Sequence, residues 1–229
     1  MAKENMEERI KKLEKELEQY KSLAREVERL KAIHEIQNLV GKYEVVHTPK
    51  TMSLTPELFA LKQPDVSVEI AMWGVFIGAE SIKKMYSHME ESGARPGMMF
   101  EHQLTTPIIE VADDLQTAKG LWFSPGHETP FVDGKLQARW CWGKFGADFI
   151  KEEGKWKIWH YHWYDTFMVP FDKSWVDTPQ PARGVIEEHP GFKPDKPPTS
   201  RSTYYPDEIR RPIPWYPEPY KTWDGKSVC

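Results

Sequence analysis

The sequence is poor in several features that would assign a protein to a class. Only two of its 229 residues are cysteines, Cys141 and Cys229, which makes no disulfide framework and favours a reducing cytoplasm. No apolar run reaches the roughly 18 residues that span a bilayer, so no membrane partner is expected, and the charged first segment is unlike a secretory signal. The net charge of −4 argues against nucleic acid as a partner.

Catalytic sequence motifs are also scarce. The chain has no internal repeat, no phosphate-binding glycine loop and no nucleophilic serine or cysteine motif. Cys141 lies between two tryptophans without an adjacent base, so it is predicted to be buried and inert.

Tryptophan and proline are in surplus, with 10 and 19 residues. The tryptophans concentrate in residues 122–175 and near the C-terminus, and the prolines concentrate in the last third. Aromatic side chains crowded into one strand region indicate either a pocket for a flat apolar ligand or a tryptophan-rich core or interface. The length allows one domain with extensions, or two small domains.

Residues 4–46 are predicted to form one long helix, because apolar residues recur three and four positions apart with glutamate and lysine between them. The stripe consists of Ile10, Leu13, Leu17 and Tyr20, followed after a phase slip by Leu23, Val27 and Leu30. It has coiled-coil character, so residues 1–32 are predicted to join copies of the chain in a homo-oligomer. The alternative is that the stripe packs along the chain's own domain.

The middle of the chain is predicted to form a strand pair, a helix and then four long strands. Alternation over 66–77 predicts the strand pair, and one apolar face over 79–91 predicts the helix. The long strand candidates are 99–111, 117–125, 136–150 and 155–168. This order predicts an α+β fold in which residues 33–176 form a cone-shaped, curved antiparallel sheet wrapped around helices, with a cavity under its concave side.

Residues 177–229 differ in composition from the rest. Their many prolines exclude regular structure, while their tyrosines and tryptophans are not typical of a disordered tail. We expect an extended C-terminal arm that docks on a surface, with a neighbouring subunit as the expected surface.

Four local strings carry a resemblance to a known family. They are IQNLVGKY at 36–43, WGVFIG at 73–78, FEHQ at 100–103 and GKWKI at 154–158. Their order and spacing resemble the SnoaL-like branch of the nuclear transport factor 2-like superfamily over residues 33–170. Its members include scytalone-dehydratase-like enzymes, bile-acid dehydratases, polyketide cyclases and lyases that release formaldehyde from lignin-derived diaryl compounds. The resemblance implies an α+β barrel that performs acid–base chemistry, in many members without metal or organic cofactor.

Three candidate residues come from this resemblance. His102 matches the catalytic histidine of the scytalone-dehydratase type, His127 matches the second histidine that follows a proline, and Tyr43 matches a pocket tyrosine. An imidazole with a pKa near 6.5 is a competent proton carrier. The type has aspartate after the tyrosine, where this chain has Glu44, so dehydration of that particular substrate is not implied. The alternatives are a core histidine at 102 and a surface histidine at 127.

Further candidates come from the strand patterns. Lys144 in an apolar cone would have a lowered pKa and could act as a base or oxyanion partner, whereas on the solvent face it would be inert. Asp148 could orient a histidine, act as a base or form a salt bridge at the barrel edge. His160 and His162 share one strand face opposite Tyr161, and the pattern leaves open which face points inward. These three residues are predicted ligand contacts, and so are Trp73, Trp122 and Trp140. The alternative for Trp73 and Trp122 is packing in the core.

The predicted function is that of a cofactor-independent lyase. Its substrate would be a small hydroxylated aromatic or polycyclic compound, and the reaction a dehydration or a retro-aldol release of formaldehyde. No metal is expected, because the strand of His160 and His162 lacks the glutamate of a cupin-like metal motif. The alternatives are a non-catalytic ligand-binding or assembly module, or an isomerase or cyclase of the same fold.

Overall fold

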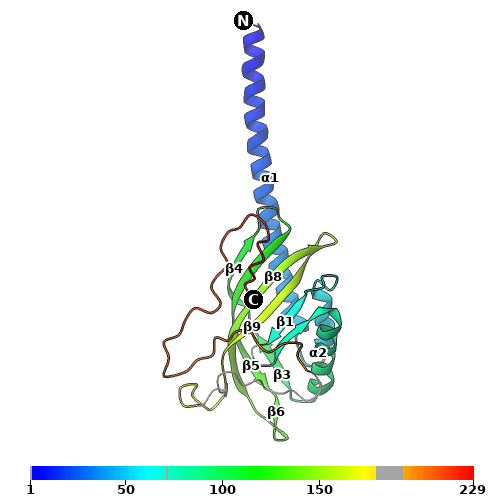
Figure 1. The fold of residues 1–229 in the computed structure, drawn as a ribbon, viewed down its shortest axis with the longest axis vertical. Coiled ribbons are helices and arrows are strands. Elements are labelled where there is room, and N and C mark those ends of the chain that lie inside the picture. Colours follow the sequence, from blue (N-terminus) through cyan, green and yellow to red (C-terminus); the bar gives the residue numbers. More distant parts are fainter. Residues whose placement is uncertain (1, 71, 179–192) are drawn as a thin grey trace.

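The computed structural model describes residues 2–70, 72–178 and 193–229. Three helices line one side of the molecule: α1 (Ala2–Val46), the short 3-10 helix η1 (Met52–Leu58) and α2 (Gly78–Gly93). No described helix is long and apolar enough to cross a membrane. Figure 1 shows that the first half of α1 projects beyond the rest of the chain, whereas its second half passes behind the sheet.

Seven strands form one curved, unclosed sheet, which confirms the predicted α+β cone. The order is β2-β1-β9-β8-β5-β3, with β4 also beside β5, and all pairs are antiparallel except β1 with β9. The strands are β1 (Ser67–Ile70), β2 (Gly74–Ile77), β3 (Met99–His102), β4 (Thr105–Val111), β5 (Thr117–Thr129), β8 (Arg139–Glu152) and β9 (Lys155–Pro170). A separate pair consists of β6 (Phe131–Val132) and β7 (Lys135–Leu136).

The prediction of one continuous strand over 99–111 is wrong. It divides into β3, which pairs with the end of β5, and β4, which pairs with the first part of β5. The register of β4 shifts between Thr105 and Ile108, and Thr106 there has a φ of 52°. This local irregularity breaks the ladder and lets two short strands follow the bend of one long partner.

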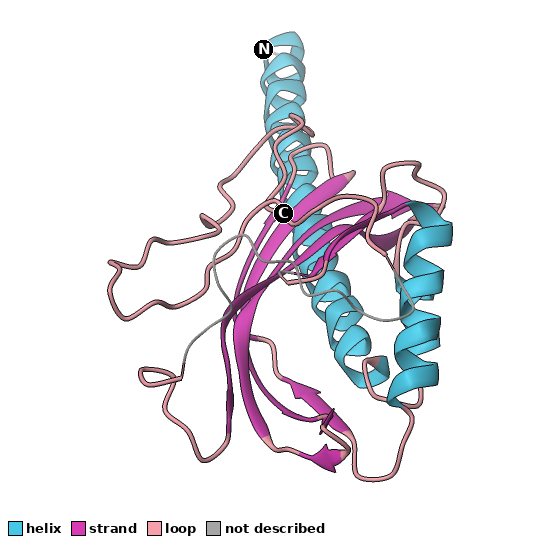
Figure 2. Cartoon of the chain, turned by 60° about the horizontal axis from the view of Figure 1, so that its bottom comes forward, coloured by secondary structure: helices cyan, strands magenta, loops and turns pink. Residues whose placement is uncertain are grey.

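The hydrophobic core lies between the concave face of the sheet and the helices (Figure 2). The inward residues of β8 and β9 follow the two-residue alternation of a strand; they are Phe145, Ala147 and Phe149 on β8, and Tyr161 and Trp163 on β9. The residues of α1 that pack in this core are Ala32, Ile36, Leu39, Val40 and Tyr43. Their three- and four-residue spacing places them on one helix face.

The described part of the C-terminal arm, residues 193–229, contains no helix or strand and contacts the outer face of the chain's own sheet. Two buried carboxylates of the sheet bind the arm. On the outer face, Asp148 accepts a hydrogen bond from the backbone N–H of Val228. Asp165 of β9, which pairs with Gly143, accepts hydrogen bonds from Arg201. Residues 179–192 lie outside the described structure, and association of subunits through the arm stays a prediction.

Candidate functional site

The site begins at His102, the last residue of β3, whose ring lies against β5. His102 pairs with Gly126, where a Cβ atom would come within 2.5 Å of the histidine Cδ2. A glycine at 126 therefore leaves room for the ring to lie flat on the sheet. Glu128 lies two residues further along the same face of β5, and its Oε1 is 3.1 Å from Nε2 of His102. The 17° interplanar angle shows that the His102 ring is stacked on Trp163 of β9.

The charges of His102 and Glu128 stabilise each other. Burial alone would lower the pKa of His102, but the hydrogen bond and charge of Glu128, with smaller contributions from Glu44 and Glu101, raise it above its ordinary value. Burial would raise the pKa of Glu128, but His102, Cys141 and Arg139 together lower it. The two side chains are 12% and 15% exposed, so they remain open to one side.

Helix α1 brings two further titratable groups to this place. His47 lies one turn after Tyr43, stacks on its ring with centroids 5.1 Å apart, and has its own centroid 5.8 Å from that of His102. Burial, helped by the charge of His102, lowers the pKa of His47 to about 3, so this ring is neutral near pH 7. Burial raises the pKa of Glu44 to about 7, against the opposing charge of His102.

Three tyrosine hydroxyls lie beside the histidines. The oxygens of Tyr43 and Tyr86 are 3.1 Å apart, and Tyr161 hydrogen-bonds Tyr43. Burial raises the pKa of all three phenols well above the ordinary value, so they stay protonated and can donate hydrogen bonds. Apolar rings of Phe59 and Phe145 surround the cluster.

Cys141 gives this site a potential set of metal ligands. One ligand atom each from His102, Glu128 and Cys141 lie within 4.8 Å of one another. A nitrogen, an oxygen and a sulfur donor fit zinc chemically, and metal binding would deprotonate a thiol whose pKa is raised by burial. The same His102 and Glu128 side chains that hydrogen-bond each other would thus be two of the three ligands.

Three predicted catalytic residues, His127, Lys144 and Asp148, do not lie on the same face of the sheet as His102. His127 is adjacent to Glu128 in the strand, so it lies on the opposite face, where its ring packs on Trp140 with centroids 4.8 Å apart. Lys144 donates a hydrogen bond to the backbone of Ile213 in the arm, and its pKa is lowered by burial and by Arg210.

Asp148 and the two histidines of β9 also lie on the outer face. Asp148 Oδ2 is 2.9 Å from Nδ1 of His160. His162 is fully buried with its Nε2 3.2 Å from Glu69, and burial lowers its pKa to about 3. The strand-face question left open by the sequence is thereby answered: Tyr161 points inward and both histidines point outward.

The tryptophans predicted to contact a ligand are divided between the two sides. Trp122 lies on the concave side, with its ring centroid 5.5 Å from that of Phe145. Trp73 is partly buried against the core, between β1 and β2. Trp140 lies on the outer face with His127.

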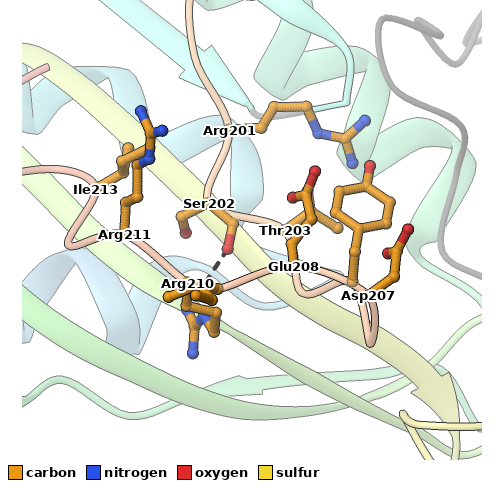
Figure 3. Close-up of a pocket in the computed structure, with 10 residues that line it drawn as sticks. Arg201, Ser202, Thr203, Asp207, Glu208, Arg210, Arg211 and Ile213 are labelled. Carbon is orange, nitrogen blue, oxygen red and sulfur yellow. Dashed lines mark hydrogen bonds between the residues drawn. The ribbon is translucent and has the colours of Figure 1, made fainter.

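A cavity of about 800 Å³ is lined by residues of the arm (Figure 3), and His102 is not among the lining residues. Its lining comes from residues 201–213. Two of its arginines already have partners, because Arg201 binds Asp165 and Arg210 donates to the backbone oxygen of Ser202 at 3.5 Å. Volume alone therefore does not mark this cavity as the reactive centre, and we assign that role to the titratable cluster on the concave side. The enclosed pocket expected there stays a prediction.

Sequence reasoning missed four members of this cluster: Glu44, His47, Tyr86 and Glu128. The sequence marks Glu44 only as the residue that stands where the family type has an aspartate. His47 could have been found from its four-residue spacing to Tyr43, which places both on one helix face. Tyr86 belongs to an apolar helix face and gives no separate signal. Glu128 becomes visible only through the β3–β5 register, which sets Gly126 opposite His102.

These features define a class of protein: an open α+β cone whose helix-covered concave side holds a histidine–carboxylate pair and tyrosine hydroxyls. Residues 28–162 match the model of the SnoaL-like domain, and the chain belongs to this family. The resemblance inferred from the sequence is thereby confirmed.

Solved structures of similar fold include a candidate scytalone dehydratase from Novosphingobium aromaticivorans. It has 14% identity and a TM-score of 0.51, and the match covers 64% of this chain and 92% of that one. A type 2 hexachlorocyclohexane dehydrochlorinase has 15% identity and a TM-score of 0.53, covering 73% and 99%. A type 3 dehydrochlorinase from Novosphingobium barchaimii has 15% identity and a TM-score of 0.52, covering 72% and 99%. At these identities the likeness shows the fold. No curated protein sequence matches the chain.

Proposed function

We propose that this protein is a cofactor-independent lyase that acts by acid–base catalysis on a small hydroxylated aromatic or polycyclic compound. The observation that carries the proposal is the buried contact of 3.1 Å between His102 and Glu128, beside tyrosine hydroxyls and a glutamate with a pKa of about 7. Two of the solved structures with this fold bear the names of a dehydratase and a dehydrochlorinase, and both names denote eliminations.

His102 is the proposed base. Glu128 accepts the proton on Nε2, which leaves the lone pair on Nδ1 and orients the ring. The raised pKa makes the imidazole a stronger base and confines its neutral form to higher pH. The apparent pKa of the acid limb in the pH–rate profile of the enzyme should therefore lie above the ordinary histidine pKa of about 6.5.

The proton donor is proposed to be Glu44, because its pKa of about 7 leaves much of it protonated at neutral pH. In a dehydration, a C–H proton would pass to His102, a C=C bond would form, and the C–O bond would break as Glu44 protonates the leaving oxygen. In a retro-aldol release of formaldehyde, His102 would take the hydroxymethyl O–H proton, the C–C bond would break, and Glu44 would protonate the carbanion. The hydroxyls of Tyr43 and Tyr86 would hydrogen-bond the developing negative charge.

His127, Lys144 and Asp148 are left out of this proposed machinery, since they lie on the outer face. Of the expected ligand contacts, Tyr161 and Trp122 fit the proposal because both lie on the concave side.

Incubation of the protein with a panel of hydroxylated aromatic and steroid-like compounds, followed by mass spectrometry, tests the proposal. Loss of water or of formaldehyde is expected from at least one compound, at the same rate with and without EDTA. An unchanged mass with a new chromatographic peak would instead favour an isomerase. No conversion of any compound would favour a binding module, and loss of activity in EDTA would contradict the cofactor-independent mechanism.

Replacing Glu44 by glutamine is expected to lower the pKa of His102, because the glutamate charge is one of the causes that raise it. An NMR titration of the His102 Cε1–H signal measures this without any substrate. Glu26→Gln, on the exposed part of α1, is the matched control and should leave the titration unchanged. A His102 titration that is unaffected by Glu44→Gln would contradict the electrostatic contact between them.

A further inference from the structure

Helix α1 carries two apolar faces, of which one is buried in the cone and the other is exposed. Its second half buries a face in the cone, from Ala32 to Tyr43, and those apolar side chains are at most 8% exposed. The first half carries apolar side chains that are between 49% and 70% exposed, including Met6, Ile10, Leu13, Leu17, Tyr20 and Val27. An apolar stripe that remains exposed on a projecting helix is a feature of interaction surfaces.

Most residues of the exposed stripe follow a heptad, while Leu23 and Leu30, which are 61% and 64% exposed, fall at the flanking g positions. With Ile10 at position a, the a positions are Ile10, Leu17 and Ala24, and the d positions are Met6, Leu13, Tyr20 and Val27. We call these seven residues the seam. They extend over 22 residues, or about 33 Å at a rise of 1.5 Å per residue. Three heptads of this kind are typical of a coiled coil.

The seam points away from the chain's own domain. In the same heptad the residues buried in the cone occupy b, c and f positions, on the side of the helix about 180° from the seam. Arg25 at b and Arg29 at f are the side chains that reach the domain, through the backbone oxygens of Asp113 and Val111. The domain thus covers one side of α1 and leaves the seam open.

The seam ends where the helix meets the cone. The next a and d positions are Lys31, His34, Asn38 and Gly41, none of which is a large apolar residue. The apolar heptad is therefore confined to the part of α1 that projects in Figure 1. An isolated helix segment of this length is only marginally stable in water, so a partner on the seam would also stabilise the projection.

The flanking charges indicate which partner fits. In a parallel coiled coil, a g residue faces the e residue five positions later on the other helix. Here Arg9 at g would face Glu14 at e, and Glu16 at g would face Lys21 at e. Both pairs are attractive, and a twofold axis produces each of them twice. Surface ion pairs add little affinity, so the apolar seam supplies the binding and the charges select the register.

We propose that a second copy of this chain covers the seam, in a parallel, in-register, two-stranded coiled coil. The two cones then lie on the same end of the coil, each on the outer side of its own helix. This assembly is independent of the catalytic proposal, because no residue of the seam is near His102.

Disulfide trapping tests the orientation in the full-length chain, with Cys229→Ser as background because that thiol is partly exposed. Leu13→Cys is expected to form a disulfide-linked dimer under mild oxidation, since d residues face their own copies only in the parallel, in-register arrangement. Ser22→Cys, at an f position on the outside of the coil, is the matched control and is expected to stay unlinked. Failure of Leu13→Cys to cross-link, or equal linking of both variants, would overturn the proposal.

Sedimentation equilibrium tests the surface itself. The unmodified chain is expected to have the mass of two copies, and the double variant Leu13→Glu with Leu17→Glu the mass of one. The control pair Lys15→Glu with Ser22→Glu changes two f positions and should keep the dimer. The thermal transition of the cone shows that each variant is folded. An unmodified chain with any mass other than two copies, or a dimer that survives the seam variant, contradicts the proposal.

Discussion

Replacing His102 by glutamine should reduce the rate of the elimination by about 10²- to 10⁴-fold, the usual contribution of a general base. The change removes the imidazole that receives the substrate proton, and with it the charge of His102 that helps to lower the pKa of Glu128. The measurement is kcat/KM for whichever compound of the panel is converted. The thermal midpoint of the variant, followed in parallel, separates loss of catalysis from loss of folding.

His127→Gln is the matched control for this substitution. His127 is one residue from Glu128, but its ring packs on Trp140 on the outer face. Its replacement should change the rate by less than about twofold, because a side chain on the outer face cannot exchange a proton with a substrate on the concave side. A folded His102→Gln variant with full activity, or a larger loss from His127→Gln than from His102→Gln, would refute the assignment of the base.

The second large effect is expected on stability, at the place where the C-terminal arm meets the sheet. Asp165 is 3% exposed and accepts hydrogen bonds from Arg201 at 2.8 and 3.2 Å and from the hydroxyl of Thr203. Asp165→Asn should lower the free energy of unfolding by about 3–5 kcal/mol, because removal of one partner leaves the other charge of a buried pair uncompensated.

Urea unfolding of the two chains measures this difference. Asp207→Asn is the matched control, since Asp207 belongs to the same arm but is exposed, and its effect should stay within about 0.5 kcal/mol. If Asp165→Asn unfolds at the same urea concentration as the original chain, the arm contributes nothing to folding through this contact.

The local elements could be predicted from the sequence because their causes are local. The apolar face over 79–91 corresponds to α2, which the structure extends by one residue before and two after. Alternating residues located β8 and β9 to within a few positions. The interruption at residues 103–104, which divides the predicted strand 99–111 into β3 and β4, was not predicted. It depends on the pairing of these two strands with different parts of β5.

The candidate site was only half predictable. The resemblance pointed to His102 and Tyr43, which the structure links through the ring of His47. It pointed equally to His127, which the strand alternation turns to the other face. Glu128 had no motif of its own, because it meets His102 through a pairing across 26 residues of sequence.

The sequence by itself determined the order of helices and strands, the apolar faces and the heptad on α1, because each depends on a period of two, three or four residues along one element. Only the tertiary structure decided which strand face is concave and which side of the sheet the arm covers. A period tells which residues share a face, but the partner of that face is set by pairing and packing with segments far away in the chain. Both the His102–Glu128 contact and the burial of Asp165 under Arg201 come from such long-range packing.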